Sequence, residues 1–93
     1  MNESDLIRNH IRPYLESLGA RVIKQHGNAF TEAGVADLLI CFKGKFIALE
    51  AKLGKEEPRL NQFAFLRSIE KAGGRAGWCN EKDWKEVINK MLL

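Results

Sequence analysis

Ninety-three residues provide one compact domain and leave no room for a second hydrophobic core. The composition, 45% hydrophobic and 29% charged, is that of an ordinary globular protein, and no stretch approaches the roughly 18 consecutive apolar residues of a membrane span. The net charge of +3 permits nucleic-acid binding without establishing it. We therefore treat residues 1–93 as a single domain whose function must come from particular residues.

The N-terminus has neither the basic start nor the apolar run of a signal peptide. We therefore expect the protein to act in the cytoplasm of a bacterial or phage-infected cell. Cys41 and Cys79 lie far apart in the chain and outside any CxxC pair, which argues against a zinc site. In a reducing cytosol we expect both to be buried free thiols.

Apolar residues recur at helical spacing over residues 3–18 and predict a helix that Gly19 would end. Pro13 lies inside this helix and predicts a bend, because proline removes a backbone hydrogen bond. Residues 20–25 are short and rich in β-branched side chains, which predicts a strand. A loop is expected over residues 27–34.

Residues 37–42 form a nearly continuous apolar run, as in a buried strand. Lys43-Gly44-Lys45 is expected to make a tight turn, with residues 46–52 as the returning strand.

The rest of the chain predicts a loop over residues 54–57, a helix from Pro58 to about Ala72 and a strand over residues 75–79. Asn80 can cap a final helix. The predicted order is αβββαβα, a mixed α/β domain.

Three chemical groups are expected at one end of the predicted hairpin. Side chains alternate along a strand, so Glu50 and Lys52 should face one way, and counting back from the turn places Asp37 near one of them. Two adjacent carboxylates repel unless a cation lies between them, and oxygen ligands suit Mg²⁺ or Mn²⁺. The lysine could then act on water or on phosphate. The alternative is an ordinary ion pair at a solvated strand end.

Two helical residues extend this candidate site. Gln62 lies at the centre of the apolar face of its predicted helix and needs a partner, which is either an active-site group or a backbone carbonyl or water. Glu3 projects to the core side of the first helix and could reach a metal, although a carboxylate there also suits the helix dipole. Glu16 projects to the opposite side and is expected at the surface.

Four basic residues are expected to flank the site, where they could contact phosphates. They are Lys43, Lys45, Lys55 and Arg59. The alternative for them is a solvated charged surface.

The ordered set of Glu3, Gly34-Val35-Ala36-Asp37-Leu38, Glu50-Ala51-Lys52, Gln62 and Ala72-Gly73 resembles the VRR-NUC family (virus-type replication-repair nucleases) of the PD-(D/E)xK superfamily. The resemblance covers nearly the whole chain. It implies a restriction-endonuclease-like fold, with a mixed sheet flanked by helices. It also implies hydrolysis of DNA phosphodiesters with Mg²⁺ or Mn²⁺.

By this likeness four positions supply metal ligands: Asp37, Glu50, Glu3 and the carbonyl of Ala51. Lys52 corresponds to the family's catalytic lysine, and Gln62 to its glutamine. Ala36 stands where the family usually has proline, which loosens the motif without removing a catalytic group.

The resemblance further suggests a small phage-like endonuclease that acts in DNA repair on branched DNA, with four-way junctions (Holliday junctions) favoured. We expect a homodimer with two active sites, because a junction needs two symmetry-related cuts. A related resolvase or restriction-like nuclease sharing only the superfamily core is a second reading. The alternative from another class is a nuclease-like domain that binds nucleic acid without cutting it, although the intact Asp37, Glu50 and Lys52 argue against this.

Overall fold

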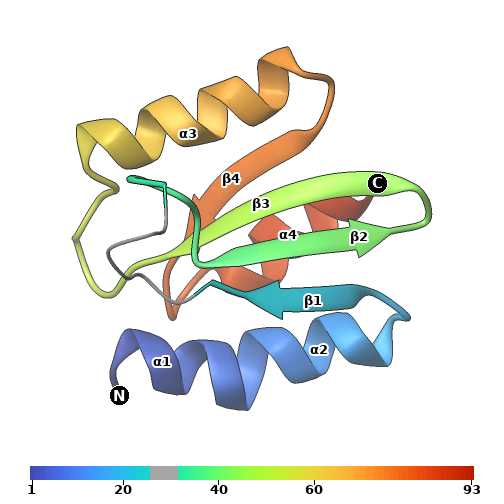
Figure 1. Cartoon of the computed structure of the whole chain (residues 1–93). Helices are drawn as coiled ribbons and strands as arrows, with labels where there is room; N and C mark the ends of the chain where they lie inside the picture. The colour runs from blue at the N-terminus through green and yellow to red at the C-terminus, as the bar shows by residue number, and fades with distance from the viewer. Residues whose placement is uncertain (26–31) are drawn as a thin grey trace.

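The computed structural model describes residues 1–25 and 32–93, and within them a four-stranded sheet lies between two layers of helices (Figure 1). The strand order is β1-β2-β3-β4, with the first three antiparallel and β4 parallel to β3. The order of elements confirms the predicted αβββαβα. Most of the loop predicted over residues 27–34 lies outside the described residues. None of the helices described is long and apolar enough to cross a membrane.

The N-terminal helix forms as three successive segments: α1 (Glu3–Leu6), a π-helical turn η1 (Ile7–Ile11) and α2 (Arg12–Ser17). The amide of Arg12 donates to the carbonyl of Ile7, five residues back. This wider turn lies directly before Pro13, which has no N–H to donate. The disturbance expected at Pro13 therefore takes the form of a π turn. Gly19 ends the helix at φ +93, as expected.

The central hairpin consists of β2 (Leu38–Phe42) and β3 (Lys45–Ala51), with β1 (Arg21–Lys24) paired to the outer side of β2. Lys43 and Gly44 have φ of 49° and 80°. Positive φ at both central positions is typical of a two-residue hairpin turn, because such a turn matches the twist of the two strands that it joins. This turn fixes the register of the hairpin, in which Leu38 pairs with Leu49.

The C-terminal half contains α3 (Leu60–Lys71), β4 (Arg75–Cys79) and α4 (Trp84–Leu92). The helix α3 covers one face of the sheet, and the N-terminal helix and α4 cover the other (Figure 1). The side-chain oxygen of Asn80 accepts from the amides of Lys82 (2.8 Å) and Asp83 (3.0 Å) and closes a turn before α4. The prediction that Asn80 caps the final helix is wrong, because α4 begins at Trp84 with Asp83 at its N-cap position.

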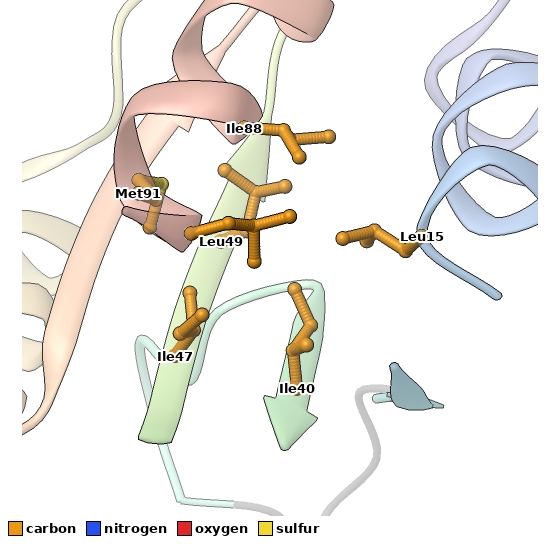
Figure 2. A pocket seen from close by; sticks show the side chains of 7 residues that line it. Leu15, Ile40, Ile47, Leu49, Ile88 and Met91 are labelled. Atoms are coloured by element: carbon orange, nitrogen blue, oxygen red, sulfur yellow. The ribbon is translucent and has the colours of Figure 1, made fainter. Parts of the chain in front are cut away.

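The main hydrophobic core lies between the sheet and the layer of α2 and α4. Figure 2 shows side chains from α2, β2, β3 and α4 converging there, and seven of them leave no space wide enough for a water molecule: Leu15, Ile40, Ile47, Leu49, Ile88, Met91 and Leu92. This wholly apolar seam is packing and offers no polar group to a ligand.

The prediction that both cysteines are buried is confirmed for Cys79 and wrong for Cys41. Cys79 is fully buried, and burial raises the pKa of its thiol to about 12. Cys41 is exposed. It pairs with Phe46, which is 45% exposed, on the sheet face that α3 covers only in part. The apolar run over residues 37–42 does not show how much of this sheet face α3 covers.

Candidate active site

The hairpin register places Asp37 opposite Glu50. Leu38 pairs with Leu49, so one step further from the turn brings Asp37 against Glu50 at the end of the hairpin. The Asp37 side chain is fixed across the strands, because its Oδ2 accepts from the amide of Ala51 at 2.9 Å. Its own carbonyl accepts from the amide of Gln25 at 2.8 Å. The two carboxyl groups therefore meet at the site end of the sheet, as the sequence predicted.

Glu50 is almost completely buried, with 1% of its surface exposed. Among the residues described, its Oε2 has no hydrogen-bond partner. Burial, followed by a side-chain hydrogen bond with Asp37 and the negative charge of Asp37, raises the pKa of Glu50 to about 9. A buried carboxyl oxygen without a partner is costly, and a cation bound there would satisfy it.

Lys52 is the first residue beyond β3 and remains on the sheet, because its amide donates to the carbonyl of Cys79 at 2.9 Å. Only 8% of the residue is exposed. Its positive charge partly offsets the rise in the pKa of Glu50, so the ammonium group lies within electrostatic reach of that carboxyl. The predicted trio of Asp37, Glu50 and Lys52 therefore comes together.

Glu3 lies within the electrostatic reach of this trio. Its pKa is raised, by burial first and then by Asp37 and Glu56, while Lys52 and Arg59 act in the opposite direction. In the part of the chain that the structure describes, however, no three His, Cys, Asp or Glu side chains lie close enough together to hold one metal ion. Glu3 faces the site from further away than Asp37 and Glu50 do.

Glu16 is exposed and forms a 3.3 Å ion pair with Arg12, as expected for a surface residue.

Gln62 is buried, as predicted, and its side-chain oxygen accepts from the amide of Arg59 at 2.8 Å. This bond satisfies an N–H at the start of α3 that has no acceptor within the helix backbone. The partner is thus neither a carbonyl nor a water but the backbone of the preceding turn. Gln62 therefore stabilises the first turn of α3, since Arg59 is the N-cap residue of that helix.

The basic residues divide between the two ends of the hairpin. Lys55 and Arg59 follow Lys52 and lie at the site end. Lys43 and Lys45 lie at the turn, so the prediction that they flank the site is wrong. Lys45 precedes Glu50 by five residues of extended strand, which is about 17 Å.

One contact that the sequence analysis missed joins the chain beyond Lys52 to the start of α4. Both carboxylate oxygens of Glu81 accept from the amide of Gly54, at 2.8 and 3.0 Å. The positions of the two residues in the sequence could have indicated this contact. Gly54 follows β3 and Glu81 follows β4, and neighbouring parallel strands end at the same edge of a sheet.

A solved structure described as a VRR_NUC domain superposes on this chain with a TM-score of 0.77, covering 96% of this chain and 97% of the other at 20% sequence identity. The chain therefore has the fold of a VRR_NUC domain, a nuclease-type fold, as the sequence resemblance implied. No protein-family model and no curated protein matches the sequence.

Proposed function

We propose that this protein is a metal-dependent nuclease that hydrolyses phosphodiester bonds of DNA at Asp37, Glu50 and Lys52. The observation that carries the proposal is the buried Glu50 carboxyl, whose Oε2 has no partner within the described residues and which lies beside a second carboxyl and a lysine. A buried carboxyl oxygen without a partner destabilises the fold unless a ligand satisfies it. The VRR_NUC-type fold supports the same reading.

The donor set fits a hard divalent cation. Mg²⁺ is commonly bound through one or two carboxylates, with water and substrate phosphate completing its octahedral shell. Asp37 and Glu50 supply the two carboxylates, and we propose the carbonyl of Ala51 as a further ligand. Glu3 lies too far from this pair for direct binding, so we propose that it reaches the ion through a water molecule. When bound, the ion supplies Lewis-acid polarisation of a phosphate and an acidified water.

The chain's own groups have separate tasks in this scheme. The bond from Ala51 holds the Asp37 carboxylate in one orientation. Lys52 donates to charge that develops on the phosphate, or orients the attacking water, from a largely buried position where such interactions are strengthened. Gln62 stabilises the first turn of α3.

We further propose branched DNA, such as a four-way junction, as the substrate and a homodimer as the working form. One site cuts one strand at a time, and a two-fold dimer presents two sites to two symmetry-related strands. Lys55 and Arg59 are at the site end, where they can contact the DNA backbone. DNA repair in the cytoplasm of a bacterial or phage-infected cell is the setting that we propose.

The test is cleavage of labelled duplex, flap and junction DNAs with Mn²⁺ or Mg²⁺ against EDTA. Asp37→Asn and Glu50→Gln should each lower the rate by roughly a thousandfold or more, because each removes a central ligand. Glu86→Gln is the matched control, since Glu86 is exposed and pairs with Lys90 at 3.3 Å on α4. Near-normal cutting by Asp37→Asn or Glu50→Gln would refute the site. Wild-type protein that binds these DNAs with Mn²⁺ and leaves them intact would favour the non-cutting alternative.

A further inference from the structure

The chain that carries Lys52 leaves the sheet directly after it. Ala51 is the last residue of β3 that pairs with β4. Beyond it, the Lys52 amide still joins the chain to β4 by donating to the carbonyl of Cys79. A turn follows, closed by the amide of Glu56 on the carbonyl of Leu53 at 3.1 Å. Lys52 therefore lies at a strand end, where a second point of attachment decides how firmly its backbone is held.

That second attachment comes from the connection between β4 and α4. Glu81 accepts the Gly54 amide with both carboxylate oxygens, at 2.8 and 3.0 Å. The side-chain amide of Asn80 donates to the Gly54 carbonyl at 3.4 Å. Both polar groups of the Gly54 backbone are thus bound by residues distant in sequence.

The connection between β4 and α4 is held in shape by hydrogen bonds within it. Asp83 accepts from the amide of Asn80 at 2.7 Å, while the Asn80 side chain accepts from the amides of Lys82 and Asp83. The amide of Trp84 also donates to the Asn80 carbonyl, at 3.1 Å. Glu81 therefore projects from a turn that is fixed to the start of α4.

We propose that Glu81 is a positioning residue for Lys52, which it holds in place through Gly54. This inference rests on the proposed nuclease function. Lys52 is only 8% exposed, so its packed side chain has little freedom to compensate for a shift of the backbone that carries it. Displacement by about 1 Å can lower a catalysed rate by roughly a hundredfold. Glu81 does not act on the reacting phosphate itself.

Four proteins test the proposal: the wild type, Glu81→Ala, Glu81→Gln and the surface control Glu86→Ala. Glu81→Ala should lower kcat by about tenfold to a hundredfold, with KM and the affinity for Mn²⁺ unchanged. Glu81→Gln should recover most of the rate, because its amide oxygen can still accept from Gly54. Glu86→Ala should match the wild type. If Glu81→Ala does not fold, Glu81→Asp, which is one methylene shorter and keeps the charge, takes its place.

Hydrogen exchange of the amides in residues 51–56 provides a readout independent of cleavage, and it should quicken in Glu81→Ala but not in Glu86→Ala. Wild-type kcat in Glu81→Ala, unchanged exchange, an effect on KM alone, or an equal loss in Glu81→Gln would each overturn the inference. A wild type that cuts no DNA would instead overturn the proposed function, and this inference with it.

Discussion

Replacing Glu50 by glutamine should remove a pH-dependent loss of stability from the metal-free protein. Glu50 is 1% exposed, and its pKa is raised from 4.5 to about 9, first by burial and then by Asp37. Above pH 4.5 the unfolded chain gives up this proton, while the folded protein retains it until about pH 9. The folded state therefore binds more protons across this window, and its stability must fall as the pH rises.

The magnitude follows from the number of protons involved. A difference of one bound proton changes the free energy of unfolding by about 1.4 kcal/mol per pH unit. Between pH 6 and pH 8 this is roughly 3 kcal/mol, a large part of the roughly 5–14 kcal/mol expected for a domain of this size. Glutamine has nearly the same shape and does not titrate, so this contribution is absent from Glu50→Gln.

The assay is urea unfolding in EDTA at pH 6 and pH 8, for wild type, Glu50→Gln and the surface control Glu86→Gln. We expect the wild type and the control to lose stability between these pH values, and Glu50→Gln to lose much less. Mg²⁺ should restore stability at pH 8 in the wild type but not in Glu50→Gln, because binding favours the ionised carboxylate. Equal pH slopes in wild type and Glu50→Gln would refute the reasoning.

Further predictions concern the other site residues and the assembly. Lys52→Ala should lose most of the cleavage rate yet keep its affinity for Mn²⁺ in titration calorimetry, and loss of both would reject a non-ligand role. Glu3→Gln should weaken cleavage or its metal dependence, whereas Glu16→Gln should leave both unchanged because Glu16 is exposed; equal effects would contradict the inward placement of Glu3. Gln62→Leu should lower the free energy of unfolding by about 1 kcal/mol in urea titrations, since the Arg59 amide loses its acceptor, and should also slow cleavage; full activity would make Gln62 purely structural. Light scattering at micromolar concentration should show a homodimer, and a monomer that still cuts both strands of a junction would rule out the dimer model.

The sequence predicted that Asp37 lies near Glu50 or Lys52, because this placement depends on local rules. A two-residue turn sets the register of a hairpin, and the alternation of side chains then decides which residues share a face. Lys52 follows from the same alternation. The observed turn is one residue shorter than predicted, because Lys45 already belongs to β3, and the pairing of Leu38 with Leu49 places Asp37 opposite Glu50 and not Lys52.

The features that the sequence did not predict depend on contacts between distant segments. The apolar spacing predicted a helix around Pro13 but not the π turn before it. The exposure of Cys41 depends on how far α3 extends over the sheet. The bond between Glu81 and Gly54 needs β3 and β4 to be parallel neighbours, which no single segment reveals.

The strand β3 shows how so small a chain can support a buried polar site. Ile47 and Leu49 face the main core, where α2 and α4 pack over them (Figure 2). Ala48 and Glu50 face the other way, and Ala48 packs under α3 in the smaller cluster with Ala36 and Leu66. One face of the strand thus contributes hydrophobic stabilisation, while the other carries a carboxyl group whose ionisation opposes folding. Because the two faces alternate along a single strand, the core that stabilises the fold also fixes the backbone of the proposed metal ligand. A bound cation would then remove the electrostatic penalty without any rearrangement of that core.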